Sequence, residues 1–399
     1  MKEVILRPSK ERGFNRRFKV GLLSFLTAWL IGFGLDYKKV FRAYDQSDLD
    51  HYTRNSKQDD RYSERITVIE VDEDDYRELF GSMSPLRQST LVAIVKKILD
   101  YRPPPRVLGV DLLTGDWPAP LDVQDFQDKR VVWARDGKQA ANDTEVPLVR
   151  LRGVAGHSQK PKAICAAPPF LPVDSDRGVR AYYTGVHATE GDSKGMKVVQ
   201  TMPVLLASVF PDNAFDCDAA GHAQEKLIRF FGKWHRIPGG IPASSVLRDM
   251  EWALSPKISN RIVLLGATYD AARDRYWTPS GHQDGVYILA HAVETELSGG
   301  PRRLQPGENA GIALVSGLLF YIAAFVLKQP FDLILSAIAP VVFAFVAGWM
   351  LYDHFGFFMG LASSMLGVPI GVAVEHYAEH LDLVARLHSA PTVNTNAKE

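Results

Sequence analysis

Three aspartates stand at the carboxyl ends of apolar runs that have the length of β-strands: Asp72, Asp111 and Asp270. In open parallel α/β sheets, ligands bind in the crevice beyond the carboxyl ends of the strands. If the three strands are neighbours, these carboxylates line one crevice, and Asp274 follows closely in sequence. Such a group would bind a hard cation or an amine-bearing ligand, or act as an acid/base pair if one pKa is raised.

The same aspartates have a second interpretation. Aspartate at the end of a strand commonly caps the helix or turn that follows, because its short side chain accepts hydrogen bonds from nearby backbone N–H groups. Capping is the more frequent role, and residue types alone do not decide between a cap and a ligand. Both interpretations are therefore kept for Asp72, Asp111, Asp270 and Asp274.

Other motifs with a chemical mechanism are missing or incomplete. The sequence contains no P-loop, no G-x-G-x-x-G before a helix, no G-x-S-x-G and no kinase signature. His376 to His380 match the H-x-x-E-H spelling of inverted zinc proteases, but too few residues follow for the further acidic ligand. We interpret this segment as the end of an amphipathic helix, and we expect no catalytic residue, no metal and no cofactor.

The chain has only two cysteines, Cys165 and Cys217, which excludes a scaffold held together by several disulfides. Both fall in the part of the chain that we expect to lie outside the cytoplasm, where disulfides form. The sequence does not fix the distance between their Cα atoms, which a disulfide restricts closely. One disulfide and two separate buried thiols therefore both remain open.

The composition limits the class of protein. The chain has 399 residues, 46 Lys and Arg against 46 Asp and Glu, and 46% hydrophobic residues. This length allows two or three folded units. A net charge of zero argues against a chain built to hold nucleic acid, which needs a basic excess. We therefore expect no nucleic-acid partner.

Four uncharged segments have the composition of membrane-spanning helices: 20–35, 310–327, 333–352 and 357–374. Each approaches the roughly 20 residues that cross the hydrocarbon core as a helix. A basic stretch precedes the first segment and no small-x-small cleavage pattern follows it, which favours an uncleaved anchor over a signal peptide. Because Lys and Arg stay on the cytoplasmic side, we expect both termini inside and the intervening domain outside.

These segments divide the chain into five predicted parts. They are a basic cytoplasmic N-terminus, a transmembrane anchor, an extracytoplasmic domain, three transmembrane helices and a short cytoplasmic tail, at residues 1–19, 20–37, 38–305, 308–376 and 377–399. The lipid bilayer is thus the first predicted partner of the chain.

Between the membrane segments, the hydrophobic pattern alternates between strand and helix. The run 66–71, a helix opened by Ser84-Pro85 and the run 107–113 form a βαβ unit, whose two strands should be parallel. Further strands are predicted at 131–134, 179–188, 226–231 and 261–267, and further helices at 198–210, 243–254 and 286–297. The expected fold class is α/β, with a mixed or parallel sheet and flanking helices, plus four transmembrane α-helices.

Several stretches together resemble the CHASE2 family: RITVIEVDEDDY (65–76), SPLRQSTLVAIVKKI (84–98), VLGVDLL (107–113), GGIPASSVL (239–247) and residues 261–297. The similar features are acidic residues that end the first two strands, a Pro-hydrophobic-Arg turn, and a Gly-x-Thr segment followed by Asp and Thr-Pro. They match Asp72, Asp111, Pro85-Leu86-Arg87, Gly266, Thr268, Asp274, Thr278 and Pro279. Ser84 stands where the family usually has tryptophan.

The resemblance implies an extracytoplasmic sensor in a bacterial inner membrane, with its main domain periplasmic or extracellular. Family members usually carry a kinase, a cyclase or a similar output domain after the last span, and residues 375–399 are too few for one. We therefore expect the output to reside in a separate protein. The predicted ligand-binding residues combine the strand-end carboxylates with the matched threonine: Asp72, Asp111, Asp270, Asp274 and Thr278.

The sequence thus predicts a non-enzymatic sensor or coupling subunit that recognises a ligand or partner and passes the signal to another protein. A scaffold or assembly subunit of a bacterial envelope complex is the alternative. An extracytoplasmic hydrolase that uses Asp72 and Asp111 is a weaker one, because no nucleophile or base accompanies them. A protein partner in trans is expected, and homo-oligomerisation is left open.

Overall fold

The structure of the chain is a computed structural model. It divides into two compact units, one of residues Thr53–Arg302 and one of Met1–Tyr52 with Arg303–Glu399, and each is described by itself. The residues that the structure describes are 30, 42–55, 64–122, 126, 130–135, 137–141, 148–151, 154–157, 164–190, 196–210, 216–217, 221–230, 240–248, 251–304, 307–309, 311–312, 314 and 332–358.

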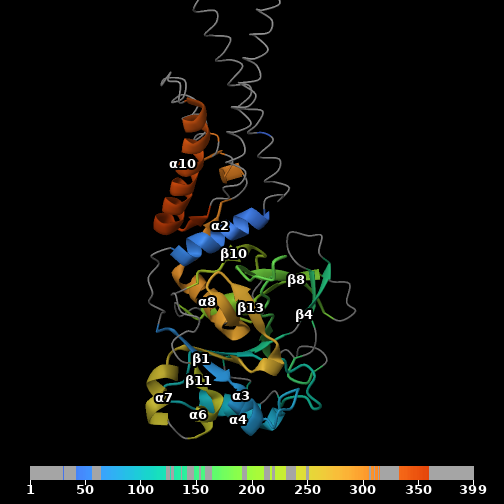
Figure 1. Cartoon of the computed structure of the whole chain (residues 1–399). Helices are drawn as coiled ribbons and strands as arrows, with labels where there is room; N and C mark the ends of the chain where they lie inside the picture. Colours follow the sequence, from blue (N-terminus) through green and yellow to red (C-terminus); the bar gives the residue numbers. More distant parts are fainter. Residues whose placement is uncertain are drawn as a thin grey trace, which may run out of the picture. The chain divides into compact units, whose positions relative to one another are not determined.

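The unit Thr53–Arg302, called here the α/β unit, is built on a sheet of six strands (Figure 1). The strand order is β11 (Ile241–Pro242), β1 (Ile66–Val71), β12 (Ile262–Ala267), β2 (Val107–Asp111), β3 (Val131–Ala134) and β6 (Cys165–Ala167). Every neighbouring pair is parallel. The inner strands are continuous apolar runs because helices cover both faces of the sheet.

Side chains alternate along each strand between two separate cores. On β1, Ile69 and Val71 belong to one core, and Ile66 and Val68 belong to the other. The first core is completed by α3 (Glu73–Glu78), α4 (Gln88–Leu99), α6 (Ala243–Leu247) and α7 (Glu251–Ile258). The second is completed by α5 (Met202–Ala207) and α8 (Gly285–Ser298). The fold is therefore three layers of helix, sheet and helix (Figure 1).

Shorter strands form smaller sheets in the same unit. One has four strands in the order β4 (Gly137–Ala141), β5 (Leu148–Leu151), β8 (Gly185–Glu190) and β9 (Met196–Gln200). Two antiparallel pairs join β7 (Ala181–Tyr183) to β10 (Glu225–Leu227), and β13 (Arg275–Thr278) to β14 (Gly281–Asp284). The 3-10 helix η2 (Asp270–Ala272) precedes the second pair.

The two cysteines form one disulfide in the α/β unit. Cys165, the first residue of β6, is bonded to Cys217, and their Cα atoms are 5.5 Å apart. The structure thus decides between the disulfide and the two free thiols that the sequence left open.

The other unit contains α10 (Asp332–Phe355), β16 (Phe357–Phe358) and most of α2 (Arg42–Asn55). Strand β15 (Arg302–Arg303) lies at the boundary of the two units. The ring of Tyr52 on α2 packs against Phe345 and Tyr352 of α10, with centroid distances of 5.8 and 5.9 Å. This aromatic contact holds the two helices together inside the unit.

The main expectations about the fold are confirmed. The unit is α/β with a parallel sheet and flanking helices, and strands 66–71 and 131–134 have the predicted bounds. The strands β1 and β2 are parallel, as the βαβ pattern predicts, but β12 lies between them. Strand β12, the last of the six strands along the chain, thus lies in the middle of the sheet. Local sequence patterns do not reveal this arrangement.

Several predicted helix boundaries are wrong. Helix α4 begins at Gln88 and not at Ser84-Pro85, because Leu86 is buried and its carbonyl accepts the Trp117 indole N–H at 3.0 Å. The predicted helix 198–210 is only α5, since the preceding residues pair with β8 as strand β9. The predicted helix 243–254 is divided into α6 and α7.

Three predicted strands are shorter than their apolar runs. Strand β2 ends at Asp111, and β10 ends at Leu227. The run 179–188 divides into β7 and β8 at Thr184, whose backbone N–H donates to the Gln224 carbonyl at 2.9 Å. In each case tertiary pairing, and not the apolar pattern, sets where the strand ends.

The four predicted membrane spans are not confirmed. The segments 20–35, 310–327 and 357–374 lie largely outside the described residues, and α10 covers the segment 333–352 as a helix. A search of the described residues finds no helix with both the length and the apolar character that crossing a membrane requires. The segment His376 to His380 and the predicted tail also lie outside the described residues.

Candidate functional site

A cavity of about 630 Å³ lies at the carboxyl edge of the parallel sheet. Four neighbouring strands contribute to it from this edge. Asp111 ends β2 and Ala267 ends β12, whereas Arg135 and Pro168 directly follow β3 and β6. This is the position at which open α/β sheets bind ligands, because the loops that leave the strands diverge there.

Two carboxylates of the predicted set meet in this cavity. Asp111 comes from the sheet, and Asp274 comes from the loop between η2 and β13. The Tyr276 hydroxyl donates a hydrogen bond to Asp274. Among the described residues, no hydrogen-bond partner of the Asp111 side chain is found. Asp111 is therefore a group of this cavity that lacks an internal partner within the described part of the chain.

The first turn of α8 fixes the position of Asp274. The backbone N–H of Gly285, the first residue of α8, donates to the Asp274 carbonyl at 2.8 Å. A Cβ at position 285 would overlap the carboxylate of Asp274, so only glycine leaves room for it. The amino end of a helix favours a negative charge, which also holds the carboxylate there.

The cavity raises the pKa of both carboxyl groups. Burial is the larger cause for Asp111, whose pKa lies well above its ordinary value, and the nearby charge of Asp274 adds to it. Burial also raises the pKa of Asp274, and the Tyr276 hydrogen bond opposes that rise. The two groups thus favour sharing a proton over carrying two negative charges.

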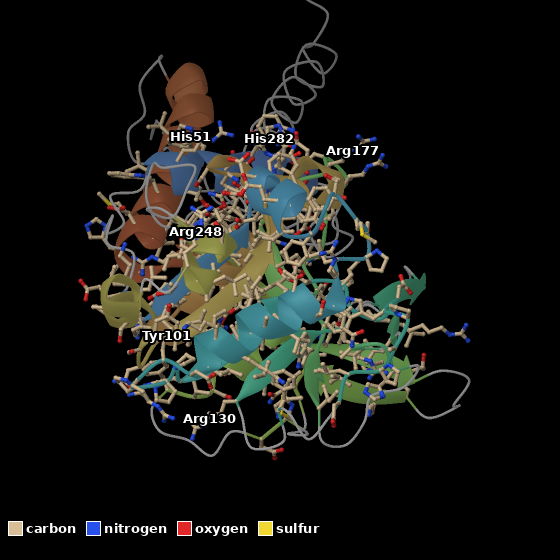
Figure 2. The ribbon with its side chains drawn as sticks, turned by 90° about the horizontal axis from the view of Figure 1, so that it is seen from below. His51, Tyr101, Arg130, Arg177, Arg248 and His282 are labelled. Atoms are coloured by element: carbon tan, nitrogen blue, oxygen red, sulfur yellow. A yellow bond between two sulfur atoms is a disulfide. The ribbon has the colours of Figure 1, made fainter. Side chains whose placement is uncertain are left out.

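Two arginines add positive charge to the lining of the same cavity. Arg135 is buried and Arg273 is exposed, and both line it together with the exposed Asp116. The arginines labelled at the periphery of Figure 2, Arg130 and Arg177, do not line the cavity. Local composition gave no signal for Arg135, because a charged residue after a strand is usually solvated.

Aromatic and proline side chains form the remaining walls. Tyr269 lines the cavity and stacks on Tyr76, with ring centroids 4.1 Å apart and an interplanar angle of 4°. Tyr276 and Phe170 add two further rings. The remaining apolar lining is Pro85, Leu86, Leu112, Leu113, Pro168, Pro169, Leu171, Ala267, Ala271 and Ala272. The lining is thus about equally polar and apolar, and small-molecule sites combine apolar walls with convergent polar groups.

Three residues of the predicted set do not line the cavity. Asp72 caps α3, and its Oδ1 accepts the Asp75 N–H at 2.8 Å. Asp270 is exposed, and its backbone N–H donates to Glu73. Thr278 is buried in the β13–β14 hairpin, where its hydroxyl donates to the Gly281 carbonyl at 2.7 Å. The expected crevice therefore contains Asp111 and Asp274 but not these three.

The described residues contain no group of three or more His, Cys, Asp and Glu side chains that could hold a metal ion. A hard cation such as calcium needs six or more oxygen ligands. Asp111 and Asp274 alone do not provide such a set.

Comparison with known proteins gives the family. No curated protein and no solved structure matches the chain significantly. The profile of the CHASE2 domain, which is an extracellular sensory domain, matches residues 23–325. This match covers more than half of the chain and includes every strand of the parallel sheet. The predicted resemblance is thereby confirmed, and the chain belongs to the CHASE2 family.

Proposed function

We propose that the chain is a non-enzymatic sensor that binds a small ligand in the cavity at the carboxyl edge of its sheet and signals through a separate protein. The observation that carries the proposal is Asp111, a half-buried carboxylate at the cavity with no hydrogen-bond partner among the described residues. A carboxyl group desolvated without a partner costs free energy. Such a cost is typical of functional sites, where the ligand supplies the partner.

The lining of the cavity favours binding over hydrolysis. A hydrolase needs a nucleophile and a base placed within hydrogen-bond reach of each other. Among the described residues, the lining includes neither a histidine nor a cysteine. The serine that it contains is Ser84. Among the described residues, Ser84 makes no hydrogen bond to Asp111 or Asp274, so the two carboxyl groups have no side-chain nucleophile in place to activate.

The sensor is proposed to be anchored in the bacterial inner membrane, with both termini cytoplasmic and the α/β unit outside. The uncharged segments of the sequence support the anchor. The disulfide between Cys165 and Cys217 supports an oxidising compartment for the α/β unit, since disulfides persist there. A tag placed in the unit should be accessible from outside intact cells. Accessibility only after cell lysis would contradict this orientation.

A ligand screen on the full chain tests the sensor function. Thermal unfolding of the chain in lipid nanodiscs is followed against a library of small metabolites. A true ligand raises the unfolding temperature, because a ligand at about 100 times its Kd adds about 2.7 kcal/mol to the folded state. The exposed Ala271, which lines the cavity, is replaced by tryptophan to fill it.

The matched control is Ala119→Trp, at an exposed alanine that does not line the cavity. Ala271→Trp should abolish the ligand response, and Ala119→Trp should preserve it. An equal response in both variants would place the ligand elsewhere. If no compound stabilises the chain and Ala271→Trp still assembles with its native partners, the scaffold alternative is favoured.

A further inference from the structure

We propose that the ligand of this cavity carries an organic ammonium group, which binds between the carboxylates of Asp111 and Asp274. The inference rests on the proposed sensor function and names the chemical class of the ligand. It is argued from the two carboxylates, from the constraint at Gly285 and from the walls of the cavity.

The first argument is the division of roles between the two carboxylates. Asp274 already has partners, because Tyr276 donates to its side chain and Gly285 donates to its backbone. Asp111 has none among the described side chains, and it faces the same cavity. An ammonium group offers up to three N–H donors and one positive charge, so it donates to Asp111 and offsets one of the two negative charges of the ionised pair.

The second argument is that the missing side chain at Gly285 leaves space for the carboxylate of Asp274. The absence of a side chain at this position lets the Asp274 carboxylate lie against the first turn of α8. Any other residue would push the carboxylate away from this position. The fold therefore fixes one negative charge at the cavity wall, where it faces Asp111 from a different element.

The third argument separates an organic cation from a metal ion. Tyr269, Tyr276 and Phe170 present aromatic rings to the cavity, and aromatic faces attract organic cations. The proline and leucine side chains supply apolar contacts that a hydrated metal ion cannot use. The described residues also lack a cluster with enough ligands for a metal. A volume of about 630 Å³ holds a small organic molecule.

Binding of the ammonium should release a proton. Burial is the main cause that raises the pKa values of Asp111 and Asp274, and a bound cation favours their charged forms, so binding should release a proton at any pH at which the free pair still holds one. The other titratable or charged groups that line the cavity are Asp116, Arg135, Tyr269, Arg273 and Tyr276. The arginines favour loss of this proton and Asp116 opposes it, so neither alters the direction of the exchange with a cation.

The experiment compares isosteric pairs of compounds on the full chain in lipid nanodiscs. Butylammonium is paired with butanol, and phenethylammonium with phenylethanol, and binding is measured by calorimetry. The same titrations in two buffers of different ionisation enthalpy count the protons released. We expect the ammonium of each pair to bind, the alcohol to bind much more weakly, and protons to be released on binding.

Asp111→Asn is the decisive variant, with Asp270→Asn as its matched control. Asparagine has the shape of aspartate but no charge, and a charge-assisted hydrogen bond is lost, so ammonium affinity should fall about 10- to 100-fold. Asp270 lies after β12, close in sequence to Asp274, but does not line the cavity, so Asp270→Asn should bind as the native chain does. Asp274→Asn should also weaken binding. Weaker binding in both variants would exclude a folding defect specific to one of them as the cause.

The outcomes distinguish this inference from the sensor function. Equal binding of alcohols and ammonium ions, no binding by either ammonium, or unchanged affinity in Asp111→Asn would overturn the ammonium class. The sensor function would survive if another metabolite stabilises the native chain and fails with Ala271→Trp. Both the sensor function and the ammonium inference would fail if no metabolite raises the unfolding temperature of Ala119→Trp more than that of Ala271→Trp.

Discussion

The ends of strands β1 and β2 carry the same residue type at the same edge of one sheet, yet they differ in structure. Asp72 directly follows β1 and caps α3, whose first N–H groups need an acceptor. Asp111 ends β2, and the residues that follow it directly are a loop, not a helix. One aspartate is satisfied locally, and the other faces a cavity.

This comparison shows that the helix or loop that follows a strand determines the role of a carboxylate at the end of that strand. A helix that begins at once after the strand supplies N–H donors within three residues. A loop supplies none in a fixed position, so the carboxylate depends on distant residues or on a ligand. At β1 the neighbouring Thr268 N–H also donates to the Val71 carbonyl at 3.0 Å, which closes that end of the sheet.

The largest effect is expected from Gly266→Ala, at the strand between the two ends. Gly266 pairs with Glu70 of β1 and Asp111 of β2, and a Cβ there would lie 2.5 Å from Val286 Cγ2 on α8. Because a β-branched side chain on a helix cannot turn away, α8 must move off the sheet. We expect a loss of about 1–3 kcal/mol in the free energy of unfolding.

Denaturant unfolding followed by tryptophan fluorescence checks this value, with Gly307→Ala as the control because no atom of the described residues lies within 4 Å of a Cβ there. The change should weaken ligand binding as well, since α8 carries Gly285 next to Asp274. Native stability in Gly266→Ala would show that the helix and the sheet are not packed as closely as described.

A smaller loss is expected from Asp72→Ala, which tests the capped end. Removing the acceptor leaves the Asp75 N–H unsatisfied, which should cost about 1 kcal/mol. Asp72→Asn should cost only a few tenths of a kcal/mol, because asparagine caps as well as aspartate does. Thermal unfolding of the two variants gives the comparison. A large loss of ligand binding in Asp72→Asn would instead assign Asp72 to the site.

No loss of stability is expected from Asp111→Asn at neutral pH. The folded-state pKa of Asp111 is raised, mainly by burial, so its contribution to stability is present at low pH and is lost as the pH rises through that pKa. Asparagine does not titrate, so the variant should gain stability relative to the native chain as the pH rises. The raised pKa of Asp274 acts in the same direction and remains in the variant.

Unfolding temperatures of the native chain and Asp111→Asn, measured without ligand across acidic to neutral pH, test this sign. Parallel pH profiles would mean that Asp111 is not desolvated as described. A variant less stable at neutral pH than at acidic pH, relative to the native chain, would mean that the carboxylate has a stabilising partner.

Much of the α/β unit could be predicted from the sequence, because its signals are local. The β-branched run 66–71 and the run 261–267 read as buried strands, and the spacing of Leu91, Ile94 and Ile98 predicts the buried face of α4. Two of the three aspartates that line the cavity, Asp111 and Asp274, also belonged to the predicted ligand-binding set. These features depend on periodicity or on a residue directly after a strand.

The rest of the site could not be predicted, because it is assembled from distant segments. Arg135, Phe170 and Tyr269 lie in separate parts of the chain and meet only because β3, β6 and β12 end at the same edge. Apart from the run 131–134, no strand was predicted in the segment 114–178, which contains the short strands β4, β5 and β6, whose pairing sets their length. The capping role of Asp72 required the start of α3 at Glu73, which the sequence did not mark.

The alternation of strand and helix, the family and the aspartates at the strand ends can be recognised from the residues alone, because hydrophobic period and residue type are local properties. Which aspartate is capped and which faces a cavity depends on how the folded chain packs. Insertion of β12 between β1 and β2 brings Asp274 and Gly285 beside Asp111. That proximity depends on strand order, and strand order arises from packing between segments far apart in the chain.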